Sequence, residues 1–201
     1  PAISDGRPDA EIVGVLSDRP EAAALARVAG PLRWSARPRD FADRNAYEAS
    51  LGDAVAAARP DWVICAGYMR ILGEAFIARF AGRLLNVHPS LLPRHRGLHT
   101  HARALEAGDT EHGASLHFVV PELDAGAVIA QVRLPVTAEA PADPLPTRLL
   151  PREHALMVAV VRLAVAGRLA ERDGQVWVDT QCMFSPLQLD CAGELQTASR
   201  A

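Results

Sequence analysis

Apolar segments with the length of buried strands alternate with helical segments along the first half of the chain. This alternation constrains the fold more than any other feature. Strands are expected at residues 11–17, 61–67 and 83–89, each a nearly continuous apolar run such as "DWVICAG". Helices are expected at residues 20–30, 45–60 and 73–80. Continuous apolar strands joined by helices indicate a mostly parallel sheet that is covered on both faces. The sequence therefore predicts an α/β fold.

The second half of the chain has a different pattern. Residues 113–120 and 127–136 are separated by the short loop "PELDAG", which predicts an antiparallel pair added to the sheet. A last helix is expected from about Arg148 to Ala166, although Pro146 and Pro151 leave its start open. Residues 174–179 form a further candidate strand. We therefore expect one domain over residues 1–180 and a C-terminal tail over residues 181–201.

Composition excludes several classes of protein. A chain of 201 residues that is 49% apolar can bury a core of its own. The net charge of -3 and the lack of a lysine- and arginine-rich block argue against a nucleic-acid partner. Cys65, Cys182 and Cys191 lack a metal-binding or disulfide spacing, which fits the reducing cytoplasm. The apolar run at residues 155–161 is far shorter than the roughly 18 to 20 residues that span a bilayer, so no membrane partner is expected.

The strand that ends in "NVHP" carries two side chains suited to catalysis. Ligands of open parallel sheets bind at the carboxyl ends of the strands, where Asn86 and His88 lie. Residues two apart on a regular strand point to the same face. An amide that donates to a carbonyl oxygen, beside an imidazole that moves a proton, suits the attack of a nucleophile on a carbonyl group. The alternative is that His88 packs under a loop and Asn86 caps a turn.

Longer motifs point to one family. The stretches "AGYMRIL", "NVHPSLLPRHRG" and "GLHTHARALEAGDTEHGASLHFVVPELDAGAVIAQ" resemble the glycinamide ribonucleotide formyltransferases, folate-dependent enzymes of purine synthesis. The resemblance runs from about Glu11 to Asp179. The "NVHPSLLP" motif marks the wider superfamily that uses 10-formyltetrahydrofolate, whereas "GLHTH" is typical of the glycinamide branch. Methionyl-tRNA formyltransferases usually carry Arg-Gly-Ala-Ala where this chain has residues 96–99.

The resemblance implies a Rossmann-like formyltransferase fold and a catalytic trio of Asn86, His88 and Asp124. The reaction it implies is transfer of a formyl group from 10-formyltetrahydrofolate to the amine of glycinamide ribonucleotide. No metal is expected, and we expect a cytoplasmic monomer or homodimer. Asn86 would donate to the oxygen on which charge develops, and His88 would carry the proton. Asp124 would favour the charged imidazole and orient it. The alternative for Asp124 is an ordinary turn residue in "ELDAG".

The resemblance also implies two sets of binding residues. Those for the folate are Arg44, Met69, Arg70, Ile71, Leu72, Asn86, Val120, Pro121, Glu122, Leu123 and Asp124. Those for the ribonucleotide are Gly67, Pro89 and Glu153. The alternatives are that Met69, Ile71 and Leu72 are core residues at a helix entry and that Glu153 lies on a solvated helix face.

Histidines are concentrated near the expected site. Six of the seven lie between His88 and His117. His95, His99 and His101 lack a spacing and a set of partners typical of a metal centre. We expect these three to belong to a loop that encloses the site, with no metal.

The sequence departs from the family at two places that bear on substrate binding. The family opens with a strand and a Gly-Asn-Gly-Ser-Asn loop that holds a phosphate at a helix N-terminus, and nothing similar precedes "EIVGVLS". We therefore expect an N-terminally incomplete domain in which the strands beside the missing one are unpaired. Arg96 stands where proline is common, and "PADPLPTRLLPREH" is richer in proline than the usual helix entry.

Two other functions are compatible with the motifs. One is a formyltetrahydrofolate hydrolase, in which water replaces the amine, although such enzymes usually carry an added regulatory domain. The other is a folate-binding remnant without turnover, which the missing phosphate loop would explain. Loss of the formyl group distinguishes the three: it should require the amine in the transferase, require only water in the hydrolase and be absent in the remnant.

Overall fold

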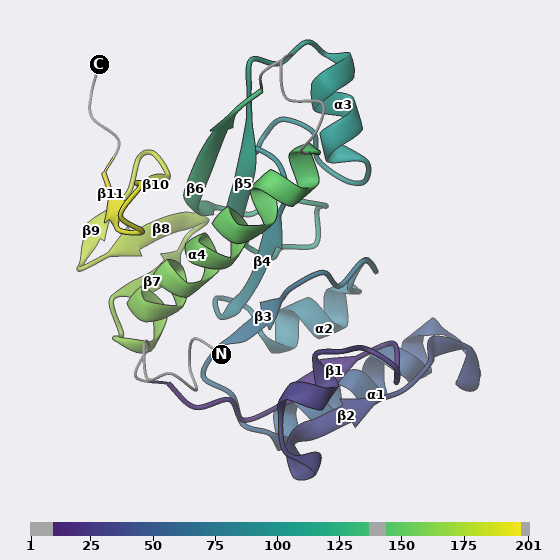
Figure 1. Ribbon diagram of the computed structural model, residues 1–201. Coiled ribbons are helices and arrows are strands. Elements are labelled where there is room, and N and C mark those ends of the chain that lie inside the picture. Colours follow the sequence, from purple (N-terminus) through teal and green to yellow (C-terminus); the bar gives the residue numbers. More distant parts are fainter. Residues whose placement is uncertain (1–9, 137–143, 198–201) are drawn as a thin grey trace.

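The computed structural model describes residues 10–136 and 144–197, and its largest element is a six-stranded sheet (Figure 1). Strand β3 (Val63–Cys65) pairs in parallel with β4 (Leu84–His88), whereas β5 (Glu111–Phe118) is antiparallel to both β4 and β6 (Val128–Pro135). The expected α/β fold with an antiparallel addition is therefore confirmed. In sheet order the strands are β11 (Leu195–Gln196), β10 (Leu187–Leu189), β6 (Val128–Pro135), β5 (Glu111–Phe118), β4 (Leu84–His88) and β3 (Val63–Cys65).

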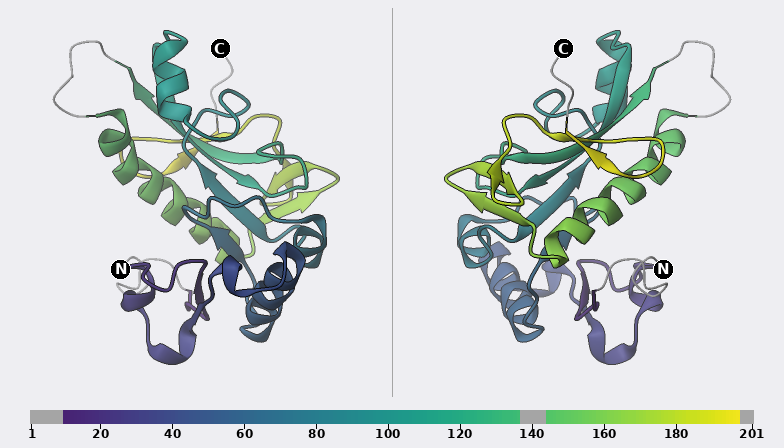
Figure 2. Two further views of the ribbon diagram at one scale, coloured as in Figure 1. Left: turned by 90° about the vertical axis from the view of Figure 1, so that its right-hand side faces the viewer. Right: turned by 90° about the vertical axis from the view of Figure 1, so that its left-hand side faces the viewer.

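Helices cover both faces of this sheet (Figure 2). Neighbouring residues of β4 show the two sides: Leu84 packs in a cluster with Phe76 of helix α2, and Leu85 packs in a cluster with Leu156 of helix α4. Successive strand residues point to opposite faces, so each side receives its own core. The three helices involved are α1 (Arg44–Ala57), α2 (Glu74–Arg79) and α4 (Leu145–Val165).

Two smaller sheets complete the described part of the chain. Strands β1 (Val15–Ser17) and β2 (Arg33–Ser35) pair in parallel, and β7 (Leu169–Arg172), β8 (Gln175–Val178) and β9 (Gln181–Cys182) form an antiparallel sheet. Within residues 10–136 and 144–197, no strand pairs with the second edge of either β1 or β3. A cavity of about 490 Å³ lies between these two strands, and we call it the β1–β3 cavity. Its wall includes Val15 and Ile64.

The prediction of a helix at residues 20–30 is wrong. The structure has only short 3-10 turns at Leu25–Arg27 (η1), Gly30–Leu32 (η2) and Pro38–Asp40 (η3). Leu25 is the one residue of the expected helix that is buried. Most helices in proteins depend on packing an apolar face, and this segment has almost no surface on which to pack one.

Helix α4 and the C-terminal segment also differ from expectation. Helix α4 begins at Leu145 rather than near Arg148, and it contains Pro151 in its interior at an exposed position. The segment expected to be a tail from residue 181 forms strands up to residue 196. Strand β10 pairs in parallel with β6, because Leu187 and Leu189 bury their side chains against the core. Three residues are too few for the strand pattern to be recognised in the sequence.

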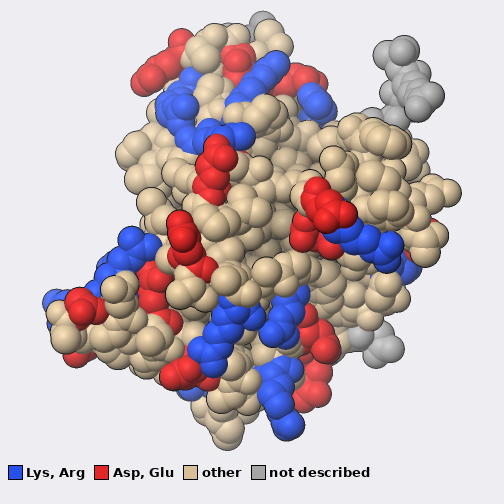
Figure 3. All heavy atoms as spheres, turned by 180° about the vertical axis from the view of Figure 1, so that it is seen from behind, with Lys and Arg blue, Asp and Glu red and all other residues tan. Residues whose placement is uncertain are grey.

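The surface carries charges of both signs. On the face shown in Figure 3, acidic and basic side chains lie interspersed over the described residues. No helix in the described part of the chain is long and apolar enough to cross a membrane.

Candidate active site

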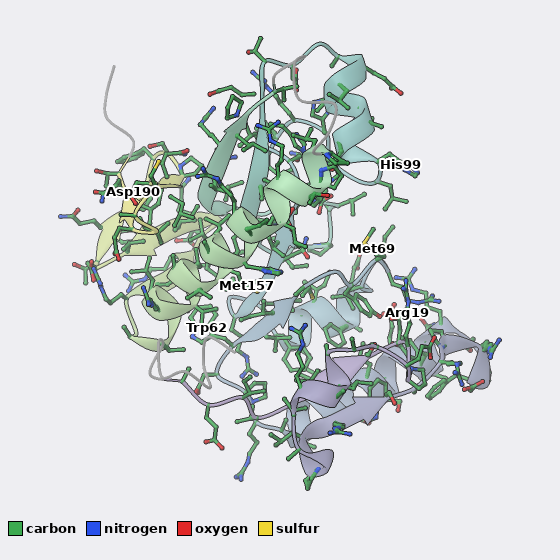
Figure 4. The ribbon with its side chains drawn as sticks, viewed as in Figure 1. Arg19, Trp62, Met69, His99, Met157 and Asp190 are labelled. Carbon is green, nitrogen blue, oxygen red and sulfur yellow. The ribbon has the colours of Figure 1, made fainter. Side chains whose placement is uncertain are left out.

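A cavity of about 810 Å³ lies at the carboxyl ends of β3 and β4, and we call it the site cavity. Its walls come from the loops that follow β3, β4 and β5 and from the first turns of α4. Figure 4 shows Met69 and His99, which line the cavity, extending from the loop after β3 and from the start of helix α3 (Thr100–Glu106). The structure therefore brings most of the residues predicted from the sequence to one cavity. They are Gly67, Met69, Arg70, Ile71, Leu72, Asn86, His88, Pro89, Val120, Pro121, Leu123, Asp124 and Glu153.

Asn86 is held by a histidine that the sequence analysis did not assign to the site. The register of β4 and β5 places Asn86 directly opposite His117, and the Asn86 Nδ2 atom lies 3.1 Å from the His117 Nε2 atom. The ring donates from Nδ1 to the carbonyl oxygen of Phe118 at 2.8 Å, so its Nε2 atom accepts from the amide. Burial lowers the pKa of His117, which favours this neutral ring. The second N–H of the Asn86 amide remains available to the cavity.

His88 lies between two hydrogen-bond acceptors. Its Nδ1 atom is 3.4 Å from the Oδ2 atom of Asp124, and its Nε2 atom donates to the carbonyl oxygen of His95 at 3.0 Å. The side chains of His88 and Asp124 are both 8% exposed. Because a carbonyl oxygen can only accept, the Nε2 atom carries a proton, and Nδ1 faces the carboxylate of Asp124. This arrangement can hold a proton at the edge of the cavity.

The loop after β5 places the carboxylate of Asp124 between these groups. Asp124 has a left-handed backbone with a φ of 49°, a conformation that aspartate adopts more readily than most residues. Gly126 permits the close turn, because a Cβ atom there would collide with the carbonyl oxygen of Phe118. The Asp124 Oδ2 atom also accepts from the N–H of Gly97 at 2.8 Å, and its Oδ1 atom is 3.6 Å from His117 Nε2.

Comparison with known proteins gives the family of this chain. The profile of the formyl transferase family matches residues 2–161. The chain belongs to the formyl transferase family. It is 44% identical over 169 residues to the phosphoribosylglycinamide formyltransferase of Escherichia coli K12, an alignment that covers 83% of this chain and 80% of that protein.

Solved structures agree with this assignment. The phosphoribosylglycinamide formyltransferase of Coxiella burnetii matches with a TM-score of 0.83 and 38% identity, over 90% of this chain and 86% of that one. A formyltetrahydrofolate deformylase from Pseudomonas syringae matches with a TM-score of 0.73 at 22% identity, over 88% of this chain and 59% of that one. The second likeness concerns the fold alone.

The "MRIL" segment of this formyltransferase divides into a core part and a cavity part. Met69 and Ile71 are 63% and 58% exposed, while Leu72 is buried in the cluster around α1 and α2. The core alternative therefore holds for Leu72 and fails for the other two. An exposed apolar side chain at a cavity offers a surface for a flat ring system.

Arg44 does not line the site cavity, but it supports the "MRIL" loop from α1. Its Nη2 atom donates to the carbonyl oxygen of Ile71 at 2.6 Å, and its Nε atom donates to Glu48 at 2.6 Å. Glu48 also accepts from the N–H of Gly73 at 2.9 Å. Glu48 was not predicted from the sequence, although it lies four residues after Arg44 at the start of an expected helix, a spacing typical of paired charges.

The other charged residues predicted for the site occupy different positions. Glu122 lies outside the cavity lining, and its side chain, 74% exposed, pairs with Arg96 at 2.8 Å. Arg70 lines the cavity and pairs with Asp18 at 3.1 Å. Glu153 reaches the cavity from α4, where burial raises its pKa.

The three histidines expected in one enclosing loop are distributed differently. His95 lies in the loop after β4, and His99 lies immediately before α3 and lines the site cavity. His101 also lines the site cavity, but it lies on α3, a helix that was not predicted from the sequence, and its Nδ1 atom is 3.0 Å from the Nε2 atom of His112. Among the residues that the structure describes, no three His, Cys, Asp or Glu side chains are grouped so that they could hold a metal ion.

Proposed function

We propose that this formyltransferase moves the formyl group of 10-formyltetrahydrofolate to the amine of glycinamide ribonucleotide. One observation carries the proposal: the amide of Asn86, the imidazole of His88 and the carboxylate of Asp124 meet at the site cavity. The similar proteins of Escherichia coli and Coxiella burnetii are both named phosphoribosylglycinamide formyltransferase, which supports the same acceptor.

Asn86 is proposed to stabilise the formyl oxygen. Negative charge develops on this oxygen as the amine attacks the formyl carbon, and a donor that is already oriented stabilises that charge without further reorganisation. His117 supplies the orientation, since it accepts from one N–H of the amide and leaves the other for the substrate. The loss of one such donor costs about 3 to 4 kcal/mol of transition-state stabilisation.

His88 and Asp124 are proposed to manage the proton. The attacking amine loses a proton as the new C–N bond forms, and the folate nitrogen gains one as the old C–N bond breaks. A protonated His88, held between Asp124 and the carbonyl oxygen of His95, can place positive charge beside the formyl oxygen and pass a proton to the leaving nitrogen. Side chains fill every role, so the proposal requires no metal.

The walls of the cavity suit the two substrates. A volume of about 810 Å³ is within the usual range for a site that binds small molecules. Met69, Ile71, Val120 and Leu123 are exposed apolar side chains at this cavity, and they are proposed to contact the folate rings. Gly67, Pro89 and Glu153 are proposed to border the ribonucleotide, for which the partly desolvated Glu153 offers a hydrogen-bond acceptor.

The test is to follow loss of the formyl group with and without glycinamide ribonucleotide. We expect tetrahydrofolate to form only with the amine, together with a product heavier by one carbonyl unit in mass spectrometry. Equal rates with and without the amine would instead indicate a hydrolase. Folate binding without any turnover would indicate a binding protein. Either of these two results would refute the proposal.

A further inference from the structure

A histidine in the loop between β4 and α3 contacts a carboxylate that the proposed function does not use. The His95 Nε2 atom lies 2.7 Å from the Oδ2 atom of Asp109, and the two side chains are 13% and 17% exposed. Asp109 follows α3, and its backbone N–H donates to the carbonyl oxygen of Ala104 on that helix at 3.0 Å. The hydrogen bond from His95 lowers the pKa of Asp109, which keeps the carboxylate charged. The His95 ring is therefore fixed to the end of a helix.

The backbone of the same residue contacts the proposed proton carrier. The carbonyl oxygen of His95 accepts from Nε2 of His88 at 3.0 Å. His95 has a φ of 52°, in the left-handed region that residues with a Cβ atom seldom adopt. Such a conformation persists where surrounding contacts hold it, and it often occurs at functional sites. The pair with Asp109 is a contact of this kind.

Other residues of the loop between β4 and α3 are held by hydrogen bonds that do not involve His95 or Asp109. Before His95, the N–H of Leu92 donates to Ser115 at 3.0 Å, and the hydroxyl of Ser90 donates to the carbonyl oxygen of Arg94 at 2.7 Å. After it, the N–H of Gly97 donates to Asp124. His95 lies between these anchors, and the contact of its side chain with Asp109 adds a further restraint on its orientation.

We propose that Asp109 is a positioning residue of the active site, which acts through His95 to hold a carbonyl oxygen against Nε2 of His88. The kinetic consequence rests on the proposed function, whereas the geometric one does not. A carbonyl acceptor at Nε2 keeps a proton on that nitrogen and fixes the plane of the ring, so that Nδ1 faces Asp124. Without Asp109 the ring of His88 gains alternative orientations and tautomers.

Besides His95, two groups act electrostatically on this carboxylate: His112 and, more strongly, Arg94. Its Nη1 atom is 3.8 Å from Asp109 Oδ1, and its side chain is 63% exposed. Exposed pairs at this distance contribute little. The effect of removing Asp109 is therefore expected to come from His95.

Three variants test the proposal in the full chain. Asp109→Ala removes the partner of His95, and Asp109→Asn keeps a neutral acceptor. His95→Asn retains a residue that tolerates the left-handed backbone but is too short to reach Asp109. Glu106→Gln is the matched control, since it removes a carboxylate from an exposed position on α3. We expect kcat to fall about 10-fold or more in Asp109→Ala and His95→Asn, and less in Asp109→Asn, because misplacement of a catalytic group slows chemistry. KM for both substrates should stay within about 3-fold.

A spectroscopic measurement separates positioning from general damage. In the wild type, correlation spectra of the histidine ring nitrogens should show the proton of His88 on Nε2 with the shift of a hydrogen-bonded N–H. In Asp109→Ala and His95→Asn this signal should broaden or move, and in Glu106→Gln it should not. Unchanged His88 signals together with unchanged kcat in these two variants would overturn the proposal. If Asp109→Ala fails to fold, the kinetics and ring spectra of Asp109→Asn and His95→Asn test the proposal in its place. If the wild type transfers no formyl group, the proposed function fails and the ring spectra alone test the positioning.

Discussion

The Nε2 atom of His117 lies 3.1 Å from the amide nitrogen of Asn86, on residues that pair directly across β4 and β5. This contact fixes which end of the Asn86 amide faces the cavity, because His117 can only accept there while its Nδ1 donates to Phe118. The buried histidine therefore determines the orientation of the proposed donor to the formyl oxygen.

Replacement of His117 should impair turnover more than substrate binding. In His117→Phe the amide of Asn86 loses its acceptor and can rotate, so we expect kcat to fall about 10- to 100-fold, somewhat less than for loss of the donor itself. Steady-state kinetics measure this. The matched comparison is Asn86→Ala, and the double variant should be little worse than Asn86→Ala alone. Independent, multiplying losses would show that His117 acts by another route.

The part of this site that could be predicted from sequence follows from local geometry. Strand alternation and the carboxyl end of a strand place Asn86 and His88 together without knowledge of the fold. Asp124 required the family resemblance, since an aspartate in "ELDAG" is otherwise a turn residue. His117 and Asp109 were missed because their roles depend on the β4–β5 register and on the loop before α3, and neither can be read from spacing along the chain.

The fold shows the same limit. Long elements such as α1, with an apolar face and a following proline, agree with the sequence pattern. The Ala-rich segment at residues 20–30 has good helix propensity, but only Leu25 is buried, and tertiary packing decides such cases. Strand β10 is the converse case, because the pairing of Leu187 and Gln188 with β6 makes a strand of a segment with little local signal.

His88 and Asp124 should behave as one unit. Asp124→Asn preserves size but removes the charge that supports a protonated ring, and His88→Ala removes the proton carrier. We expect each to lower kcat at least about 100-fold, with a much smaller effect on folate affinity, because the "MRIL" wall is unchanged. The double variant should resemble the worse single variant. Kinetics and folate titration check this, and near-normal turnover in Asp124→Asn would make Asp124 a turn residue only.

Stability should fall in weak acid through His112. Its Nε2 atom is hydrogen-bonded to Nδ1 of His101, a contact that requires a lone pair on one of the rings. Burial and, next, the charge of His101 lower the pKa of His112 to about 4. Below a pH of about 6.5 the unfolded chain binds a proton that the folded chain resists, so the free energy of unfolding falls between pH 6.5 and 4 by up to roughly 3 kcal/mol. Urea titrations at several pH values measure this loss.

The matched variant for this pH dependence is His112→Asn, which retains a polar side chain without a titrating ring. It should be less stable at pH 7.5 but should lose less stability between pH 6.5 and 4 than the wild type. The same slope in both proteins would assign the acid sensitivity to other groups.

Hydrogen exchange should distinguish two consecutive residues of β3. The N–H of Val63 donates to the carbonyl oxygen of Arg83 at 2.9 Å, in the direction of β4. Successive amides of a strand point to opposite edges, so that of Ile64 faces the β1–β3 cavity, where no strand of the described residues pairs with β3. We expect the Ile64 amide to exchange at least about 10-fold faster than that of Val63, since local opening is easiest where hydrogen bonds are missing. Both amides exchange equally through global unfolding of the protein, so the amide of Val63 serves as the control for that of Ile64. Equal protection at both positions would mean that the open edge is covered in solution.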